Sequence, residues 1–353
     1  MITNISDFIM PSDDDFLPSM FSPRLKQLFI FLYTLVILGS VSGNCVIIVV
    51  TVCNKAMHRV VNLFFVSLAI SDTLVAVCNM PLQLEYYVSN EWNLGEAMCK
   101  ITSYIQGVSI VTSIFALTLL ATERHYAICQ PLRARAVRNG KRGVAVICIL
   151  WCLAFVIVLP QCWIQRLEMR LSLEPDNVPP IRIAHICAEF FLSVTHNEIY
   201  TYIFVVGIYF VPIGVMCYAY GKIIYILWVR TSLSVSSGTE ELDTRAQRKI
   251  QQQKYVIKLI VFVVLLFILC WLPFFAVQVY AIYHETTYIV RVYQAAFHLI
   301  GYSNSLLNPV MYGFINKSFR ENIKRTLKRI NSCIHCPLNK HNYGHDRVKN
   351  GTS

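Results

Sequence analysis

Seven long stretches of the chain carry almost no charge, and they constrain the fold more than any other feature. Six of them lack Asp, Glu, Lys and Arg, and the seventh contains only Asp72. Each is long enough to supply the roughly 20 apolar residues that a helix needs to cross a hydrocarbon core. The stretches are Leu28–Val52, Leu63–Leu84, Ile101–Thr122, Gly143–Gln165, Ile199–Gly221, Leu259–His284 and Val292–Asn316.

A closed β-barrel is the other fold that satisfies its backbone inside lipid. Barrel strands alternate over about 10 residues, whereas these stretches are apolar on all sides. Hydrophobic residues make up 56% of the chain and charged residues 14%, which excludes intrinsic disorder and argues against nucleic-acid binding. We therefore predict an all-α membrane protein in which residues 28–316 form a seven-transmembrane helix bundle.

Charge is divided unequally between the segments that connect the predicted spans. Residues 1–27 and three connections sum to −6, whereas the other three connections and the C-terminal segment sum to +18; with Asp72, this gives the net charge of +11. Lys and Arg favour the cytoplasmic side, so we expect a multi-pass plasma-membrane protein with its N-terminus extracellular and its C-terminus cytoplasmic. Asn4, in an Asn-Ile-Ser triplet, is then a candidate N-glycosylation site.

Residues 317–330 predict an amphipathic helix at the inner membrane surface, and residues 331–353 a cytoplasmic tail. The helix would be drawn to anionic lipid by its basic residues. Cys333 and Cys336 follow it. Juxtamembrane cysteines after a basic segment favour S-palmitoylation, although their spacing to nearby histidines is also compatible with a zinc site. The apolar face of the helix consists of Phe319, Ile323, Leu327 and Ile330.

Two cysteines lie at the predicted outer side, where the environment is oxidising. Cys99 begins the third span, and Cys187 lies in the long connection before the fifth span. We predict a disulfide that joins this connection to the third span. Cys162, at the outer end of the fourth span, is the competing partner.

Asp72 is the only carboxylate in the middle of a span. A charge at that depth is costly and indicates a functional site. A carboxylate among neutral oxygens suits a small hard cation, a proton or a water cluster; a hydrogen-bond network that contains no ion is the alternative. The candidate neighbours of Asp72 are Asn44, Ser113, Asn304, Ser305 and Asn308.

Five spans also contain a proline. Each proline removes a helix hydrogen bond and permits a kink. Five of them favour a bundle with a cavity and moving parts, as in a receptor or a transporter. They are Pro81, Pro160, Pro212, Pro273 and Pro309.

An ordered set of short motifs resembles the rhodopsin-like (class A) G-protein-coupled receptors, from about Leu28 to Cys336. The resemblance implies a non-enzymatic cell-surface receptor that activates a heterotrimeric G protein, with arrestin and receptor kinases as further partners. The motifs are Gly43-Asn44, Leu68-Ala69-Ile70-Ser71-Asp72, Cys99, Glu123-Arg124-His125-Tyr126, Trp151, Pro212 with Tyr220, Cys270-Trp271-Leu272-Pro273 and Asn308-Pro309-Val310-Met311-Tyr312.

The same resemblance implies roles for individual residues. Glu123, Arg124 and His125 replace the commoner Asp-Arg-Tyr and would couple to the G protein, for which relatives suggest the calcium-mobilising type. Gln251–Gln253 stands where many relatives carry an acid that locks this arginine, so we expect a lower barrier to activation. The group of Asn44, Asp72, Ser113, Asn304 and Asn308 resembles the sodium pocket of the family, which implies an allosteric sodium ion at Asp72.

Further residues resemble the activation switch beneath the ligand, although core packing alone would also explain them. These are Ile114, Pro212, Phe267 and Trp271, together with the tyrosine pair Tyr220 and Tyr312.

Gln106 stands where amine receptors carry an Asp, and a neutral amide cannot neutralise a buried ammonium group. Gln106, His298 and Tyr302 instead resemble receptors for orexin, neuropeptide FF and other C-terminally amidated peptides. Gln106 can both donate and accept hydrogen bonds, which suits a terminal amide; Gln83, Gln278 and His298 would line the same cavity, with Tyr302 below.

Glu189, two residues after Cys187, would pair with a basic residue of the peptide, and the acidic outer face would attract a cationic ligand. An acidic outer face also follows from the topology rule alone. A non-peptide ligand, or an orphan receptor with high basal activity, is the alternative function. A secondary transporter would need paired intramembrane charges or an inverted repeat with broken helices, and the sequence contains neither.

Overall fold

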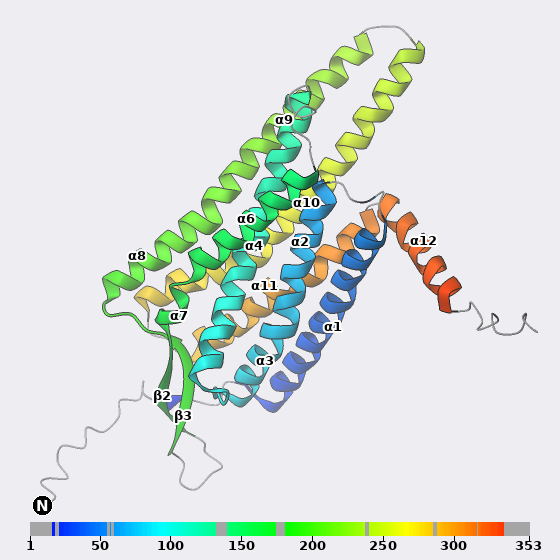
Figure 1. Ribbon diagram of the computed structural model, residues 1–353. Coiled ribbons are helices and arrows are strands. Elements are labelled where there is room, and N and C mark those ends of the chain that lie inside the picture. The colour runs from blue at the N-terminus through cyan, green and yellow to red at the C-terminus, as the bar shows by residue number, and fades with distance from the viewer. Residues whose placement is uncertain are drawn as a thin grey trace, which may run out of the picture.

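The computed structural model describes residues 16–17, 21–54, 57, 60–131, 140–173, 181–236, 240–284, 288–315 and 317–334. Long helices lie side by side as a bundle, and a β-hairpin covers one end of it (Figure 1). The elements in chain order are β1 (Phe16–Leu17), α1 (Pro23–Cys53), α2 (Val60–Leu74), η4 (Val75–Asn79), α3 (Met80–Ser89), α4 (Gly95–Cys129), α6 (Gly140–Val158), α7 (Gln161–Ile164), β2 (Gln165–Leu173), β3 (Ile181–Glu189), α8 (Val194–Phe204), η5 (Val205–Phe210), α9 (Val211–Ser236), α10 (Glu240–Tyr283), α11 (Tyr288–Ile315) and α12 (Lys317–Ile334).

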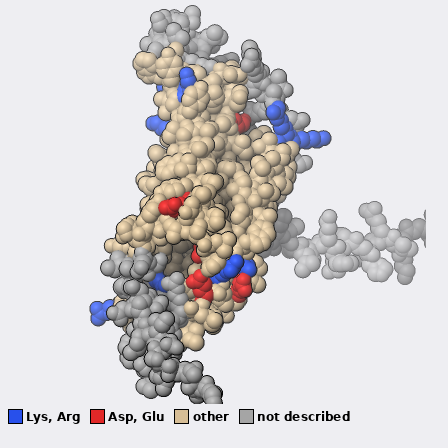
Figure 2. Space-filling view, turned by 90° about the vertical axis from the view of Figure 1, so that its left-hand side faces the viewer, with Lys and Arg blue, Asp and Glu red and all other residues tan. Residues whose placement is uncertain are grey.

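Every predicted span corresponds to a helix or to consecutive helical segments of the bundle. Within the described chain, six of these spans are long and apolar enough to cross a membrane. The seventh, α11, is 28 residues long but carries polar side chains such as Gln294, Asn304 and Asn308, which lower its hydropathy. On the face shown in Figure 2, most charged side chains lie toward the two ends and leave a broad uncharged surface between them.

The prolines shape the helices in two different ways. A wider π-helical turn precedes both Pro81 and Pro212, in η4 and η5. Proline has no N–H and crowds the preceding turn, so an extra residue in that turn relieves the clash. By contrast, Pro160 follows the end of α6 and separates it from the short α7, while Pro273 and Pro309 lie inside α10 and α11.

The β-hairpin is the main element that the all-α prediction did not include. β2 and β3 pair in antiparallel fashion from Gln165 opposite Glu189 to Leu173 opposite Ile181, and β1 adds a short parallel pairing to β2. Residues 166–171 alternate between charged and apolar side chains, which is typical of a strand. This signal was present in the sequence, although no clear turn marked the hairpin.

The glycine of the Gly43-Asn44 motif has a packing role. A Cβ atom at Gly43 would lie 2.7 Å from Cγ of Pro309, closer than real Cβ atoms approach another carbon. Glycine therefore allows α1 to pack directly against the proline of α11, and this packing brings Asn44 close to the centre of the bundle.

The helix α12 continues to Ile334, beyond the predicted end at residue 330, because no helix breaker occurs before Pro337. It is docked against the bundle, where Asn54 donates a hydrogen bond of 2.8 Å to Oγ1 of Thr326. Phe319 is buried against Tyr312, with ring centroids 4.6 Å apart, and so faces the bundle. The predicted modification sites Asn4 and Cys336 lie outside the described residues, as does the side chain of Cys333.

Candidate ligand-binding site

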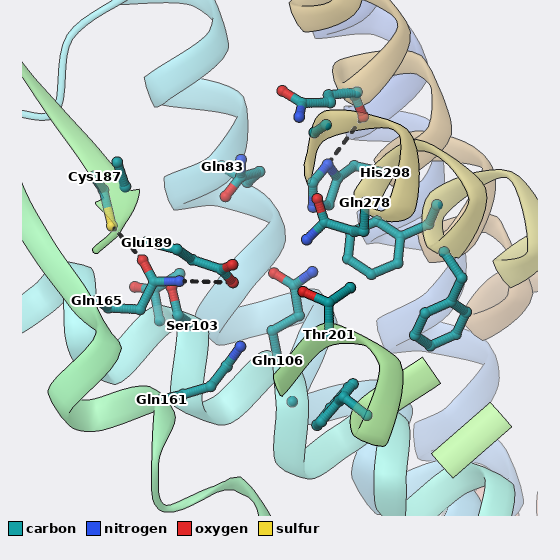
Figure 3. A pocket seen from close by; sticks show the side chains of 18 of the residues that line it. Gln83, Ser103, Gln106, Gln161, Gln165, Cys187, Glu189, Thr201, Gln278 and His298 are labelled. Carbon is teal, nitrogen blue, oxygen red and sulfur yellow. Dashed lines mark hydrogen bonds between the residues drawn. The ribbon is translucent and has the colours of Figure 1, made fainter. Parts of the chain in front are cut away.

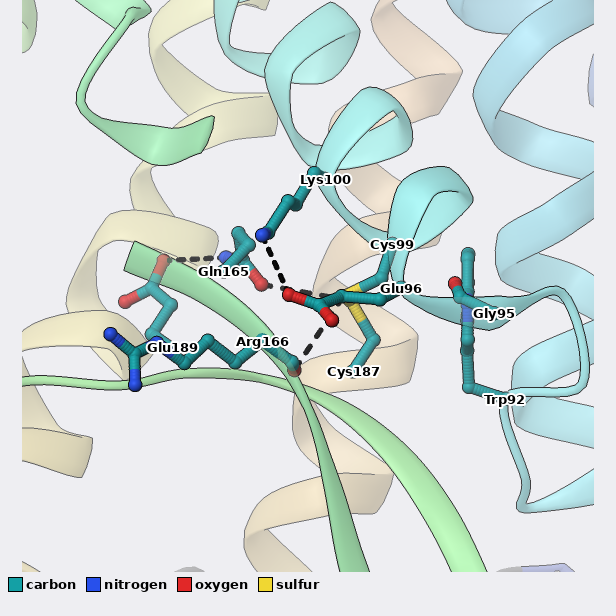
Figure 4. Close-up of a disulfide and its surroundings, with 9 residues drawn as sticks. All are labelled: Trp92, Gly95, Glu96, Cys99, Lys100, Gln165, Arg166, Cys187 and Glu189. Carbon is teal, nitrogen blue, oxygen red and sulfur yellow. Dashed lines mark hydrogen bonds and ion pairs between the residues drawn. A yellow bond between two sulfur atoms is a disulfide. The ribbon is translucent and has the colours of Figure 1, made fainter. Parts of the chain in front are cut away.

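A disulfide between Cys99 and Cys187 ties the beginning of α4 to β3 (Figure 4). This confirms the predicted pairing, and the competing partner Cys162 is a free thiol. The backbone N–H of Trp92 adds a second attachment, since it donates to the carbonyl oxygen of His185 at 2.7 Å. β3 is therefore held across the end of the bundle, and Glu189 follows two residues after the disulfide.

A cavity of about 380 Å³ lies at this end of the bundle, between the helices and β3 (Figure 3). Its volume is in the range of pockets that hold small ligands, so it has room for the last residues of a peptide. Side chains from α3, α4, β3, α10 and α11 converge on it. Five of the six residues predicted to bind ligand line this cavity: Gln83, Gln106, Glu189, Gln278 and His298.

The sixth predicted residue, Tyr302, is fully buried beneath the cavity. Its hydroxyl donates a hydrogen bond of 3.0 Å to Oε1 of Gln106, and Nδ2 of Asn79 donates to the same oxygen at 3.2 Å. Two donors therefore occupy the amide oxygen of Gln106. The NH₂ group of Gln106 remains to donate to a ligand, which makes this residue mainly a donor rather than the two-way partner that the sequence predicted.

The orientation of His298 is also determined by neighbouring groups. Its Nδ1 lies 2.8 Å from the hydroxyl of Tyr87 and 2.9 Å from the carbonyl oxygen of Gln294. The ring of Phe274 packs against it at a centroid distance of 4.8 Å. These contacts hold the imidazole as part of the polar wall of the cavity.

Several cavity residues were missed by the sequence analysis. Arg291 and Gln294 precede His298 by seven and four residues on α11, a helical spacing that places all three on one face. That signal was available. Gln161 and Gln165 also line the cavity, and they depend on the turn after Pro160 and on the start of β2, neither of which the sequence predicted.

Among the described residues that line the cavity, Glu189 is the only carboxylate, and Gln165 contacts it directly. Nε2 of Gln165 donates a hydrogen bond of 3.3 Å to Oε1 of Glu189. The surrounding protein withdraws this carboxyl group from bulk water and raises its pKa from 4.5 to about 7. The residue as a whole is nevertheless exposed toward the cavity. Near neutral pH the group therefore changes between its neutral and ionised forms.

A second polar cluster surrounds Asp72 in the centre of the bundle. Ser305 donates to Oδ1 at 3.0 Å and Asn308 to Oδ2 at 2.9 Å. Asn44 joins the cluster through the carbonyl oxygen of Ser305 at 2.9 Å, and Ser113 joins it through Ser71 at 3.0 Å. Ser305 was one of the candidate neighbours of Asp72, and here it contacts the carboxylate directly.

This cluster contains more acceptors than donors. The side-chain carbonyl oxygens of Asn44, Asn304 and Asn308 are buried, and within the described residues they have no hydrogen-bond partner. An unpaired buried oxygen is costly, and hard cations take oxygen ligands. The arrangement around Asp72 therefore fits a small cation or ordered water.

Aromatic contacts connect the cavity to the predicted switch residues. Trp271 lies 6.5 Å from Tyr302 and 6.3 Å from Phe267, measured between ring centroids. Ile114 and Pro212, the other two predicted switch residues, are also buried. Tyr302 contacts both Gln106 and Trp271, so one residue separates the cavity from the predicted switch.

At the opposite end of the bundle, Nη2 of Arg124 lies 2.8 Å from Oε2 of Glu123. Among the described residues, no hydrogen bond joins the hydroxyl groups of Tyr220 and Tyr312, the predicted tyrosine pair. Tyr312 donates a hydrogen bond of 3.0 Å to Asn62, whereas the buried hydroxyl of Tyr220 has no hydrogen-bond partner among the described residues. The ring of His125 packs 6.1 Å from that of Tyr218.

Comparison with known proteins identifies the family to which the chain is similar. Residues 43–312 match the family model described as "7 transmembrane receptor (rhodopsin family)". The chain is 30% identical over 317 residues to the pyroglutamylated RF-amide peptide receptor of Mus musculus, which covers 86% of this chain and 72% of the relative. It is 31% identical over 307 residues to neuropeptide FF receptor 2 of Rattus norvegicus, with 84% and 72% covered, and 30% identical over 342 residues to cholecystokinin receptor type A of Homo sapiens, with 82% and 78% covered.

Proposed function

Since the chain belongs to the rhodopsin family of seven-transmembrane receptors, we propose that it binds a cationic, C-terminally amidated peptide and activates a heterotrimeric G protein. The membership confirms the predicted fold class and the expectation of a receptor that is not an enzyme. The proposal includes a plasma-membrane location with the hairpin end outside the cell. It rests above all on one observation: among the described residues that line the cavity, Glu189 is the single carboxylate and many of the other polar groups are neutral amides. Arg291 is the one cation among these residues.

The cavity contains one group suited to the terminal amide of the expected ligand and one suited to its cationic side chain. The NH₂ group of Gln106 would donate to the carbonyl oxygen of the terminal amide, while Glu189 would pair with a cationic side chain. A free carboxylate in place of the amide would add a second negative charge to the cavity that holds Glu189, and its desolvation would cost free energy. The RF-amide in the name of one relative combines these two features, an arginine and a terminal amide.

The test of this proposal is G-protein activation by matched peptides. Cells that express the chain with a promiscuous G protein are exposed to a pyroglutamyl peptide ending in Arg-Phe-amide, and calcium release is recorded. We expect activation at submicromolar concentration and at least about a hundredfold weaker response to the free acid, because the free acid adds a desolvated negative charge to a cavity that already contains Glu189. Equal potency of the amide and the acid would contradict the proposal.

We also propose that the cluster around Asp72 holds a sodium ion. Asp72 and the unpaired amide oxygens of Asn44, Asn304 and Asn308 would be its ligands. The ion would supply a positive charge that stabilises the inactive arrangement, since it binds one state better than the other.

Sodium is therefore expected to weaken agonist binding. Replacing choline chloride by sodium chloride at constant ionic strength should raise the agonist dissociation constant at least about fivefold, a usual size for allosteric coupling. Asp72→Asn removes the charge at nearly the same size, so it should abolish the difference between the two salts. An agonist affinity that is the same in both salts in the wild-type receptor would exclude this role of Asp72.

A further inference from the structure

Gln165 and Glu189 form the last rung of the β-hairpin, at the point where it joins the bundle. The two residues are directly opposite each other in the antiparallel pairing, so their side chains extend to the same side of the sheet. Only 6% of Gln165 is exposed, and its Nε2 donates to Oε1 of Glu189 at 3.3 Å. On the basis of the proposed function, we infer that Gln165 is a positioning residue that keeps the Glu189 carboxylate ionised and directed into the cavity for a cationic ligand.

The chemistry of this donor distinguishes it from an ordinary ion pair. A lysine or arginine beside Glu189 would also orient the carboxylate, but it would neutralise the charge that the ligand needs. An amide donates a hydrogen bond and leaves the full negative charge in place. Within the described residues Glu189 has no ion pair, so Gln165 orients a charge that stays available.

The nearest cation on the hairpin is directed elsewhere. The guanidinium group of Arg166 lies 4.5 Å above the ring of Phe190, and the adjacent positions 165 and 166 point to opposite sides of β2. Arg166 therefore stacks on Phe190, and among the described residues it forms no ion pair with Glu189.

The backbone around the pair is also restrained. The disulfide fixes Cys187, and the N–H of Phe190 donates to the carbonyl oxygen of Ile164 at 2.8 Å. With both flanks of Glu189 held, the direction of its carboxylate depends on its own rotamer and on the Gln165 contact. The other titratable or charged side chains that face the cavity are Tyr86 and Tyr87 from α3, Tyr200 from α8, and Arg291 and His298 from α11.

A hydrogen bond to the ionised form favours that form and opposes the effect of burial. Gln165→Met keeps the length of the side chain and removes the donor, so the pKa of Glu189 should rise further above its present value near 7. At pH 7.4 a larger fraction of the carboxyl groups would then be neutral. Raising the pH should restore the charge and with it the binding of the ligand.

The experiment measures agonist potency between pH 6.5 and pH 8.5. The probe is a pyroglutamyl peptide ending in Arg-Phe-amide, which has no group that titrates in this interval when it lacks histidine and cysteine. We expect Gln165→Met to lower potency about tenfold at pH 7.4 and to return within threefold of the wild type at pH 8.5. Surface expression is measured in parallel, and Gln165→Asn, whose shorter amide cannot reach Glu189, should behave in the same way.

Gln278→Met is the matched control, because it removes a glutamine from the same cavity but not from the Glu189 contact. Any loss that it causes should be equal at both pH values. A normal pH profile for Gln165→Met in a well-expressed receptor, or a loss that persists at pH 8.5, would overturn the inference. If Glu189→Gln is then still deleterious, the proposed ligand stands without Gln165; if Glu189→Gln has no effect, both proposals are wrong.

Discussion

Replacing Cys99 with serine is expected to abolish measurable binding of an amidated agonist, even in receptors that reach the cell surface. The disulfide closes a loop with a sequence separation of 88 residues, and long loops gain most from such a link. More directly, the bond holds the strand that carries Glu189. Without it, β3 keeps its pairing with β2, and the Trp92–His185 and Phe190–Ile164 backbone contacts remain, but the covalent link to α4 is lost.

The measurement is saturation binding with labelled peptide, normalised to surface expression. Cys187→Ser should match Cys99→Ser, and the double variant should match both, since each removes the same bond. Cys162→Ser is the control, because Cys162 is a free thiol near the same end of the bundle. Wild-type affinity in a normally expressed Cys99→Ser receptor would show that the position of β3 does not matter for the ligand.

Replacing Glu189 with glutamine should lower the potency of an arginine-containing amidated agonist by about 30- to 100-fold. The variant keeps the shape of the side chain and removes its charge. Loss of one partner of a desolvated charge pair costs about 2 kcal/mol or more, and about 1.4 kcal/mol corresponds to a tenfold change in affinity. We expect the lower part of the usual range, because Glu189 remains open to water in the cavity.

The same carboxyl group should make agonist potency depend on pH. Its raised pKa, about 7, means that the ionised form is present above neutral pH and is lost as the pH falls through this value. Potency of the wild-type receptor should therefore decline between pH 8 and pH 6, and this decline should be absent in Glu189→Gln. The control is Glu96→Gln, since Glu96 pairs with Lys100 outside the cavity. A wild-type pH profile in Glu189→Gln would assign the effect to another group.

The seven spans were predictable because a membrane leaves few alternatives. A stretch such as Leu259–His284 has no charge to place in water, so its helix follows from length and composition alone. To predict that Gln106 and His298 lie in one cavity, the order of the motifs along the chain was needed as well. Once each helix is aligned with a family pattern, residues on different helices can be assigned to one level of the bundle.

A hairpin within residues 169–182 was compatible with the sequence, but its full length, its register and the residues that depend on them were not predicted. Gln165 lies opposite Glu189 only because of the register between β2 and β3, and a shift by one residue would move its side chain to the other face. Nothing in the local sequence determines that register without the disulfide position. Ser305 differs in this respect, because it was a candidate neighbour of Asp72 and does contact the carboxylate.

Cation recognition by Glu189 is tested most directly by combining a change in the receptor with a change in the peptide. Potency is measured for wild type and Glu189→Gln, each with a pyroglutamyl Arg-Phe-amide peptide and with its citrulline analogue, which has nearly the same shape but no charge. If Glu189 pairs with the arginine, citrulline should weaken the agonist about 30-fold or more on the wild type and less than threefold on Glu189→Gln. An equal loss on both receptors would place the arginine elsewhere and contradict the account.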